Sequence, residues 1–562
     1  MMLAPIFNIA EICVQKNVKH VILSPGSRCA PLTLAFVRHP EITTRTISDE
    51  RSAAFIALGL SLQTKETTAL VCTSGSAAYN YAPAVAEAYF QQIPLLILTA
   101  DRPPEWIDQL DGQTIRQENI YGKHVKKSYS LPVDYSHADA QWQVTRVINE
   151  AINISREFPQ GPVHINIPFR EPFYPEKGEH VSDDKDVKII ALEKATYSLE
   201  ETTKEKLKST LDANQKTLIV VGQQDFDASL LNAVNDFSTK HYIPIIADII
   251  SNFQQSENAI IHQDAFLAHV DYSLAPDLLI TFGKSVISKQ LKVYLRKNKP
   301  KQHWHIQQAG EVADTFQSLT KIIRTTPEVF FSEMQNVETK KTERINYLNQ
   351  WKGEDSKAIS IAYQLFDNQE FSEFEVVKLI LENLPKKSNL HLANSMSVRY
   401  ANYIGIKGKS INVYCNRGTS GIDGCTSTAL GFALETNEIT TLITGDMAFF
   451  YDRNAFWNNY IPSNLRIIIL NNHGGGIFGL IDGSSQQPEL AAYFETEQRL
   501  TAENLAKDHD EIDYFKCNSR ASFQNQLKTF FKVDDKAKIL EIVTDKLINK
   551  RIFTLFNTQR FK

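Results

Sequence analysis

Two neighbouring apolar runs decide how this chain folds: TLITGDMAFFYDRNAF at residues 441–456 and LRIIILNNHGGGIFG at residues 465–479. Each run begins like a buried strand and then ends abruptly in polar atoms, the first at Asp446 and the second at Asn472. Unbroken apolar strands are typical of parallel sheets that carry helices on both faces. Because ligands of such sheets lie beyond the carboxyl ends of the strands, Asp446 and Asn472 are expected to face one ligand.

These two strand ends offer oxygen atoms. The Asp446 carboxylate, the Asn472 amide oxygen and a backbone carbonyl from the glycines at 474–476 are hard ligands, and Mg²⁺ is commonly shared between a few such groups and a phosphate. The glycines let the backbone approach that phosphate closely. Alternatively, Asp446 caps the next helix and the asparagines form a turn. That alternative explains either strand end alone, whereas the pair of ends is more specific to a cation site.

The pair resembles the signature of thiamine-diphosphate enzymes, in which Gly-Asp is followed some two dozen residues later by Asn-Asn. The resemblance implies that the Asp446 and Asn472 side chains and the Gly474 carbonyl hold Mg²⁺ or Mn²⁺, which anchors the diphosphate. Met447 replaces the second usual glycine of the signature. The resemblance implies that Met447 also contacts the cofactor. The run GGGIFG fits a nicotinamide-binding pattern too, but the helix, strand and acidic residue that such a site requires do not follow it.

Similar apolar runs alternate with helical patterns along the whole chain, which predicts an α/β protein with three open parallel-sheet domains. A length of 562 residues is too great for a single core. Charged or polar segments at 176–188 and 334–357 suit the crossings between domains. We therefore expect domains at 1–178, 188–335 and 355–562. By the resemblance, the first binds the pyrimidine of the cofactor and the third binds its diphosphate.

The composition is that of an ordinary globular protein, 43% hydrophobic and 22% charged. No apolar run reaches the about 20 residues that span a bilayer. The formal net charge of −5 gives no indication of a surface that binds nucleic acid. The N-terminus has no basic leader, and the six scattered cysteines lack metal-ligand spacing, which predicts reduced thiols in a cytoplasmic protein.

Thiamine chemistry requires a carboxylate that shares a proton with the pyrimidine N1′ of the cofactor, and a second domain should present it at the end of a strand. The run TRTISDERSAAFIALGLSL at residues 44–62 offers Glu50, just past a short strand and at the start of a helix. Asp49 and Glu50 also favour the helix N-terminus electrostatically. That effect does not exclude the catalytic role that we expect for Glu50.

Arginines follow several of the predicted strands. An arginine stands more often at the surface or in an ion pair than in a binding site, but its planar fork binds carboxylates bidentately. Several of them at loop positions in an acidic protein therefore predict a substrate rich in carboxylates. The residues displayed in these loops are Ser27, Arg28, Arg102, Gln113, Ser395, Arg399 and Arg417.

At these residues the chain closely resembles one family. The motifs SPGSR-x-x-PL, DERSA, ADRPPE, NS-x-x-x-R, NRG-x-SGIDG and NN-x-GG-x-IF together are similar to those of the 2-succinyl-5-enolpyruvyl-6-hydroxy-3-cyclohexene-1-carboxylate synthases, the MenD family of menaquinone biosynthesis. The match runs in blocks from about residue 5 to residue 480 and is weakest in the middle domain. The resemblance implies a transferase that decarboxylates 2-oxoglutarate on thiamine diphosphate and adds the succinyl carbanion to isochorismate.

The resemblance also assigns roles to single residues. Glu50 activates the cofactor, Ile422 wedges beneath it, and Ile477 and Phe478 form an apolar wall that favours loss of charge during decarboxylation. Both substrates are dicarboxylates. The residues expected to hold their carboxylates and hydroxyls are Ser27, Arg28, Arg102, Gln113, Lys289, Ser395, Arg399 and Arg417.

Besides Met447, other positions depart from the family pattern, among them Cys29, which replaces a more usual serine. Gln290 follows Lys289 where the family often has a second cation, so one cationic contact is missing. His473 stands between Asn472 and Gly474, and the resemblance implies that its side chain points away from the metal. The resemblance further implies that the domains with Glu50 and Asp446 meet across a subunit interface. We therefore expect a homodimer or homotetramer with shared active sites.

Two other functions compete with this one. A different thiamine-diphosphate enzyme, either a 2-oxo-acid decarboxylase or an acetohydroxyacid-type synthase, would explain Glu50 and the metal motif but would leave the arginines without a role. A catalytically dead α/β subunit that only binds partners would not need Glu50, Asp446 and Asn472 intact.

Overall fold

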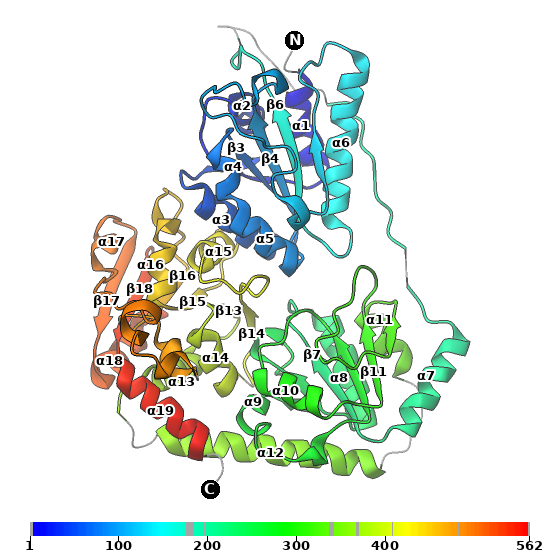
Figure 1. Cartoon of the computed structure of the whole chain (residues 1–562), viewed down its shortest axis with the longest axis vertical. Helices are drawn as coiled ribbons and strands as arrows, with labels where there is room; N and C mark the ends of the chain where they lie inside the picture. The colour runs from blue at the N-terminus through cyan, green and yellow to red at the C-terminus, as the bar shows by residue number, and fades with distance from the viewer. Residues whose placement is uncertain are drawn as a thin grey trace.

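The computed structural model describes residues 4–175, 185–195, 197–335, 342–366, 370–406, 408–481 and 483–559. Within them lie three open sheets of six parallel strands each, as the unbroken apolar runs predict. Figure 1 shows the N-terminal domain above, the C-terminal domain at lower left and the middle domain at lower right, with helix α12 (Thr342–Phe366) running along the bottom. The expected boundary at residue 178 lies outside the described residues, and residue 355 falls inside α12, so the exact domain limits stay a prediction.

The N-terminal sheet has the order β2-β1-β3-β4-β6-β5. Every residue of β3 and β4 is buried, which is why these strands contain almost only apolar side chains. Its strands are β1 His20–Leu23, β2 Thr43–Thr46, β3 Thr68–Cys72, β4 Leu95–Asp101, β5 Ser128–Ser130 and β6 Val163–Pro168. Its helices are α1 Ala4–Gln15, α2 Ala30–Arg38, α3 Glu50–Thr64, α4 Ser76–Asn80, α5 Ala82–Gln91 and α6 Ala138–Arg156.

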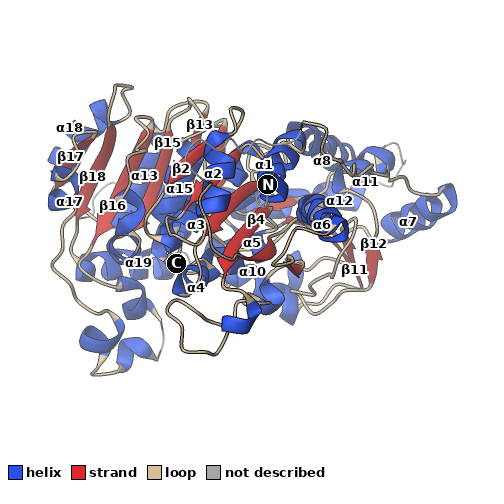
Figure 2. Ribbon diagram, turned by 90° about the horizontal axis from the view of Figure 1, so that it is seen from above, coloured by secondary structure: helices blue, strands red, loops and turns tan. Residues whose placement is uncertain are grey.

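The C-terminal sheet has the order β14-β13-β15-β16-β18-β17, which is the same arrangement as in the N-terminal sheet when the strands are counted within each domain. Figure 2 shows β17, β18, β16, β15 and β13 side by side in this order. The strands are β13 Ser388–Leu392, β14 Ile411–Tyr414, β15 Thr440–Gly445, β16 Leu465–Asn471, β17 Ile512–Cys517 and β18 Ala537–Val543. The helices are α13 Glu373–Asn383, α14 Met396–Ile404, α15 Cys425–Ala433, α16 Asp446–Tyr451, α17 Glu503–Lys507, α18 Arg520–Phe530 and α19 Lys546–Gln559.

The middle sheet differs, with the order β12-β11-β10-β7-β8-β9. Strands β8 and β9 are thus added on one side of β7, and β10, β11 and β12 on its other side. This reversal of strand order between β7 and β10 opens a crevice at the carboxyl ends of the strands. The strands are β7 Thr217–Val221, β8 Ile245–Ala247, β9 Ala259–Ile260, β10 Leu278–Phe282, β11 Gln302–Ile306 and β12 Lys321–Ile323. The helices are α7 Glu201–Ala213, α8 Ala228–His241, α9 Gln263–Phe266, α10 Lys289–Lys297 and α11 Pro327–Met334, followed by α12.

Helices α3 and α15 join the N-terminal and C-terminal domains through two glycines. A Cβ atom at Gly59 would lie 2.1 Å from the carbonyl oxygen of Thr428, and one at Gly431 would lie 2.1 Å from the carbonyl oxygen of Ile56. The two helix backbones can approach this closely only because both side chains are hydrogen atoms. The contact fixes the orientation of the two domains within one chain.

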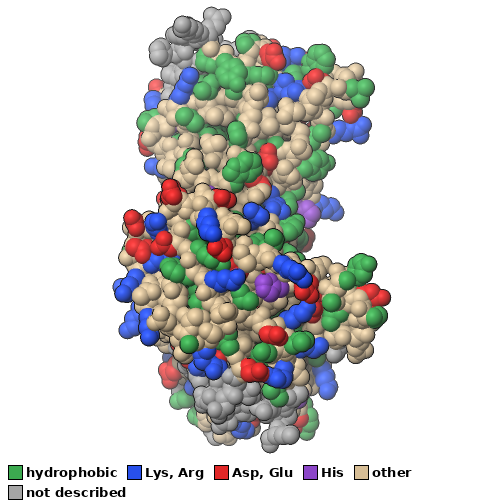
Figure 3. All heavy atoms as spheres, turned by 90° about the vertical axis from the view of Figure 1, so that its left-hand side faces the viewer, with side chains coloured by type: hydrophobic (Ala, Val, Ile, Leu, Met, Phe, Trp, Pro, Cys, Tyr) green, Lys and Arg blue, Asp and Glu red, His purple; other side chains and the backbone are tan. Residues whose placement is uncertain are grey.

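The surface carries both signs of charge. On the face shown in Figure 3, basic and acidic side chains are interspersed. Among the helices that the described residues form, none is both long and apolar enough to cross a bilayer.

Candidate active site

Asp446 is the first residue of α16 and lies at the carboxyl end of β15, next to the point where the C-terminal sheet reverses between β13 and β15. Its side chain is only 2% exposed. Gln498 donates a hydrogen bond from Nε2 to Asp446 Oδ2 at 2.6 Å. Burial raises the pKa of Asp446 to about 6, although the backbone amides of Met447 and Gly474 oppose that shift. A cation bound there would favour the ionised carboxylate.

The two asparagines at the end of β16 have different surroundings. Asn471 is tied into the domain, because its Nδ2 donates to Glu541 Oε1 at 2.6 Å and its Oδ1 accepts from the His473 amide at 3.0 Å. Asn472 donates from Nδ2 to Glu373 Oε1 at 2.7 Å. Its Oδ1 is buried and has no hydrogen-bond partner among the described residues. A buried oxygen without a donor is a position that a cation can satisfy.

The glycine turn after Asn472 passes close to another backbone segment. A Cβ at Gly474 would lie 2.8 Å from the carbonyl oxygen of Glu495, so this position requires glycine. The Gly474 carbonyl accepts the Gly476 amide at 3.0 Å, which leaves its second lone pair available. Together with Asp446 and Asn472 it offers the carboxylate, amide and carbonyl oxygens that Mg²⁺ or Mn²⁺ prefers. The residues present therefore fit the implied metal.

His473 lies within this turn, with a left-handed φ of 63°. Its Nδ1 is buried without a hydrogen-bond partner among the described residues. A positive charge on the imidazole lowers the pKa of Asp446, so the ring lies near that carboxylate. The direction in which the ring points relative to a bound metal stays a prediction.

Glu50 opens α3, as its position past a short strand predicts, and it is half-buried. The helix cap is Asp49, whose side chain accepts the Ser52 amide at 3.1 Å. Glu50 therefore does not serve as the cap, and its Oε2 instead accepts a hydrogen bond from Asn80 Nδ2 at 3.1 Å. Within the chain, the N-terminal end of α3 contacts the C-terminal end of α16, where Arg51 donates a hydrogen bond to the Tyr451 carbonyl at 2.7 Å.

Arg28 and Arg102 approach each other at the carboxyl edge of the N-terminal sheet. The charge of Arg102 lowers the pKa of Arg28, after the larger effect of burial. Arg28 donates to the Phe169 carbonyl at 2.7 Å, and Arg102 donates from Nε to Asp111 Oδ2 at 2.9 Å. Arg28 Nε is buried without a partner among the described residues, so this pair of cations has capacity to bind an anion.

A second pair of cations follows β13 and β14: Arg417 lies in the loop after β14, as predicted, whereas Arg399 lies within helix α14 and not in a loop. Arg399 donates to the Ser395 carbonyl at 2.5 Å, and Arg417 donates to Asn394 Oδ1 at 2.9 Å. Burial and then the charge of Arg417 lower the pKa of Arg399. Arg417 Nε is buried without a partner in the described part of the chain. Ser395, with a φ of 72°, holds the turn that presents this pair.

The remaining predicted residues line loops and helix ends. Ser27 and Gln113 are exposed, and so is Lys289 at the first position of α10. Ile422 and Phe478 are 38% and 37% exposed, and Phe478 packs against Phe494 with ring centroids 6.0 Å apart. Ile477 is half-buried in the short 3₁₀ helix Gly476–Leu480.

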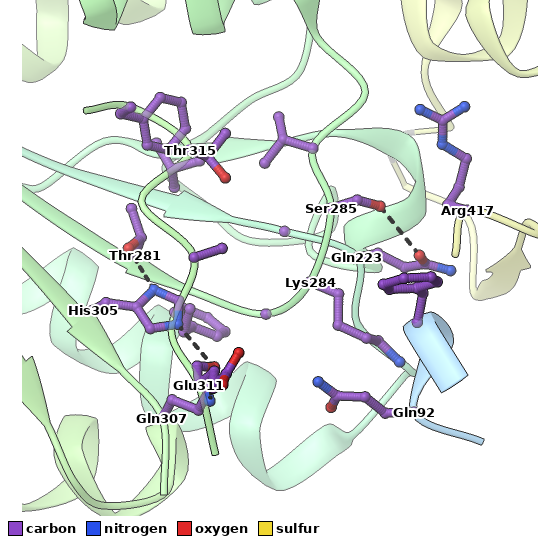
Figure 4. A pocket seen from close by; sticks show the side chains of 18 of the residues that line it. Gln92, Gln223, Thr281, Lys284, Ser285, His305, Gln307, Glu311, Thr315 and Arg417 are labelled. Carbon is purple, nitrogen blue, oxygen red and sulfur yellow. Dashed lines mark hydrogen bonds between the residues drawn. The ribbon is translucent and has the colours of Figure 1, made fainter. Parts of the chain in front are cut away.

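A crevice of about 330 Å³ lies where the middle sheet reverses (Figure 4), and of the predicted site residues only Arg417 lines it. Its polar groups are largely occupied with one another. Lys284 Nζ donates to the Gln91 carbonyl at 2.8 Å, and His305 hydrogen-bonds Thr281 Oγ1 at 2.8 Å. Arg417 reaches this crevice from the C-terminal domain, so the crevice adjoins one edge of the candidate site.

Three side chains in or beside the site were not predicted from the sequence: Glu87, Glu373 and Gln498. Each reaches its partner across a long stretch of chain, and no local pattern reveals such a contact. Glu373 follows the helix cap Ser372, so the sequence alone suggests only a favourable charge at a helix N-terminus.

A cation of the middle domain, Lys292 on α10, was also not predicted from the sequence. Burial lowers its pKa most, and the charge of Arg417 lowers it further, which indicates a cation on α10 near Arg417.

Comparisons with known proteins identify the family. Residues 7–121 match the family model "Thiamine pyrophosphate enzyme, N-terminal TPP binding domain", and residues 192–392 match "Middle domain of thiamine pyrophosphate". A 2-succinyl-5-enolpyruvyl-6-hydroxy-3-cyclohexene-1-carboxylate synthase of Cytophaga hutchinsonii is 47% identical over 557 residues, which cover 98% of each chain.

Enzymes of the same name from other bacteria are also similar. That of Flavobacterium johnsoniae is 40% identical over 96% of this chain and 95% of its own length. That of Porphyromonas gingivalis is 36% identical over 98% of this chain and 96% of its own length. With its thiamine-diphosphate domains and identity at this level over nearly the full length, the chain belongs to the 2-succinyl-5-enolpyruvyl-6-hydroxy-3-cyclohexene-1-carboxylate synthase family.

Proposed function

We propose that this protein catalyses the decarboxylation of 2-oxoglutarate and the addition of the resulting succinyl unit to isochorismate. The observation that carries the proposal is the pairing of cations, Arg28 with Arg102 and Arg399 with Arg417, each pair with a buried Nε that lacks a partner among the described residues. Both proposed substrates are dicarboxylates, and guanidinium groups bind carboxylates bidentately. A decarboxylase acting on a simple 2-oxo acid would need fewer of these cations.

Thiamine diphosphate supplies the electron sink that decarboxylation of a 2-oxo acid requires. Asp446, Asn472 and the Gly474 carbonyl would hold Mg²⁺ or Mn²⁺, and this arrangement is supported by the buried Asn472 Oδ1 without a donor in the described structure. Met447 and Ile422 would contact the cofactor. Glu50 would hold a proton at the pyrimidine N1′, and its place at the start of a helix with one donor, Asn80, leaves its second carboxylate oxygen available.

The other residues bind and orient the substrates. Arg399 and Arg417, with Ser395, would hold the carboxylates of one substrate, and Arg28 and Arg102, with Ser27 and Gln113, those of the other. Lys289 adds a positive charge from α10. Ile477 and Phe478 exclude water from the reacting carboxylate, which favours loss of its charge as CO₂ leaves.

We further propose that the enzyme is a cytoplasmic homodimer or homotetramer in which each site is shared between two chains. The six cysteines are all free and buried, which suits a reducing compartment.

The test mixes the protein with Mg²⁺, thiamine diphosphate and 2-oxoglutarate, with and without isochorismate. The loss of isochorismate is followed by absorbance, and the product is identified by mass. Consumption that requires every component, with formation of a succinyl adduct, is the expected result. Release of CO₂ and succinic semialdehyde with isochorismate untouched would contradict the proposal and indicate a decarboxylase.

A further inference from the structure

Glu373 is a buried carboxylate beside the candidate metal site, and the proposed reaction gives it no role. It is the first residue of α13 and is 2% exposed. Its Oε1 accepts a hydrogen bond from Asn472 Nδ2 at 2.7 Å, although 99 positions separate the two residues. A buried carboxylate is costly unless it is paired or hydrogen-bonded, so its position requires an explanation.

The surroundings of Glu373 hold it in place from three elements. Its backbone amide donates to Asn549 Oδ1 on α19 at 2.9 Å. Tyr400 on α14 hydrogen-bonds its carboxylate, and Thr544 at the end of β18 donates to Oε1 at 3.5 Å. Asn549 in turn donates from Nδ2 to Thr544 Oγ1 at 2.9 Å. Hydrogen-bond donors thus face the carboxylate, but burial and then the negative charge of Asp446 raise its pKa to about 7, and no cation neutralises it among the contacts of the described residues.

An asparagine side chain has two ends of nearly equal shape, an oxygen and an NH₂ group. Packing alone cannot decide which end of Asn472 faces the metal site. In the structure Glu373 Oε1 accepts a hydrogen bond from the NH₂ end of Asn472, and this contact turns the amide oxygen the other way. The structure shows this outcome, because Asn472 Oδ1 is buried and has no donor in the part of the chain that is described.

We propose that Glu373 is a positioning residue that fixes the side-chain amide of Asn472 with its oxygen toward the divalent cation. The inference rests on the proposed cation site of Asp446, Asn472 and Gly474. Without Glu373 the amide could rotate and present its NH₂ end to the cation, which cannot coordinate it. Outer partners of metal ligands commonly change metal affinity by about 10- to 100-fold when they are removed.

The experiment measures binding of thiamine diphosphate to the full chain by calorimetry at a series of Mg²⁺ concentrations, without substrates. Glu373→Gln keeps the size of the side chain but offers Asn472 a donor as well as an acceptor. We expect it to weaken Mg²⁺-dependent binding by about 10-fold or more. Glu375→Gln is the matched control, because Glu375 is buried on the same helix and pairs with Arg520 at 2.6 Å instead of with Asn472.

Exchanging the carboxylate of residue 373 and the amide of residue 472 distinguishes a positioning role of Glu373 from a purely structural one. In the double variant Glu373→Gln/Asn472→Asp, the new glutamine can donate to the new aspartate, so the total charge is kept, the direction of the hydrogen bond is reversed, and an oxygen still faces the cation. We expect the double variant to recover most of the affinity that Glu373→Gln loses. A role of Glu373 in folding alone would not be restored by the swap.

The outcomes are distinct. Wild-type protein that fails to bind thiamine diphosphate with Mg²⁺ would overturn the proposed function. Wild-type binding with equal affinity in Glu373→Gln would overturn the positioning role, and so would an equal loss in Glu375→Gln. A double variant that binds no better than Glu373→Gln would overturn it as well, and this comparison holds even if the single variant is less stable.

Discussion

The carboxylate of Glu87 in the N-terminal domain accepts a hydrogen bond from Thr419 Oγ1 in the C-terminal domain at 2.6 Å. The same carboxylate accepts the backbone amides of Gly418 at 2.7 Å and Thr419 at 2.6 Å. Glu87 is 1% exposed, so these three donors satisfy a buried charge. The loop that they fix begins at Arg417, which means that one domain orders a candidate substrate contact of another.

Glu87→Ala should therefore damage both stability and substrate binding. Hydrogen bonds to a charged group contribute about 1.5–3 kcal/mol each when one partner is removed, although such terms are not additive. We expect the free energy of unfolding to fall by about 2–4 kcal/mol, and KM for the substrates to rise more than kcat falls. Denaturant titration and steady-state kinetics measure the two effects. Unchanged KM in a folded variant would separate this contact from the site.

Glu50→Gln should leave Mg²⁺-dependent binding of thiamine diphosphate nearly unchanged and reduce turnover by a factor of about 10²–10⁴, the usual range for loss of a proton-transfer group. The amide keeps the size and the Asn80 contact but cannot exchange a proton at N1′. Glu41→Gln, an exposed change in the same domain, is the control. Full activity of Glu50→Gln would remove the residue from the proton relay.

Arg399→Ala should weaken substrate use while cofactor binding stays intact. Loss of one charge-assisted hydrogen-bonding group corresponds to a decrease in kcat/KM of about 10- to 100-fold. Kinetics with each substrate varied in turn will show which of the two Arg399 contacts. Arg38→Ala, on α2, provides a control for the loss of a positive charge. Equal kcat/KM values in wild type and Arg399→Ala would contradict the assignment.

Gly59→Ala should destabilise the protein, because its new Cβ would lie 2.1 Å from the Thr428 carbonyl oxygen. Overpacking of this kind costs about 1–3 kcal/mol. Gly353 in α12 has no atom within 4 Å of a built Cβ. Gly353→Ala should therefore be neutral or stabilising by about 0.4–1 kcal/mol through the unfolded chain. Thermal unfolding of the two variants compares them directly, and equal midpoints would argue against the close helix crossing.

His164 gives a pH-dependent contribution to stability. Burial lowers its pKa from an ordinary value of 6.5 to about 3, so the folded protein keeps the ring neutral between Thr99 and Ser128. Between pH 6.5 and pH 3 the unfolded chain binds a proton that the folded chain does not. Stability should therefore fall with decreasing pH in this range, by about 1.4 kcal/mol per pH unit from this one residue.

His164→Gln should flatten that part of the stability profile, as measured by denaturant titration at several pH values. His137 is exposed, with 76% of its side chain accessible, and His137→Gln should leave the slope as it is in wild type. A slope in His164→Gln equal to that of wild type would show that the ring is charged in the folded state or that another group dominates.

The sequence was most informative where burial is complete. The central strands β15 and β16 were predicted from the apolar runs at 441–456 and 465–479, and the three open parallel sheets were confirmed. No strand was predicted at β5, β9, β11, β12 or β17: β5, β12 and β17 are partly exposed, β9 has two residues, and β11 interleaves histidines with its apolar residues, so none forms such a run. Local patterns report burial on both faces and carry little information on strands at the border of a sheet.

The residues of the candidate site also differ in whether the sequence could predict them. Asp446 and Asn472 could be predicted because the ends of adjacent parallel strands meet at one edge of a sheet. Glu373, Gln498 and Glu87 could not, since each is defined by a partner that only the folded chain brings near. Glu87 meets a loop 331 positions away, and nothing in its own helix distinguishes it from other buried polar residues.

The close crossing of α3 and α15 has a consequence for synthesis of the chain. Residues 52–62 of α3 are all buried in the finished protein, and part of that surface is covered by α15. The ribosome makes α15 only after the whole middle domain has been translated, and the interval between the ends of α3 and α15, residues 64 to 433, takes about 20–70 s at about 5–20 residues per second. During that interval the nascent N-terminal domain exposes an apolar helix face, so chaperones that bind such faces should associate with the chain until residue 433 has emerged.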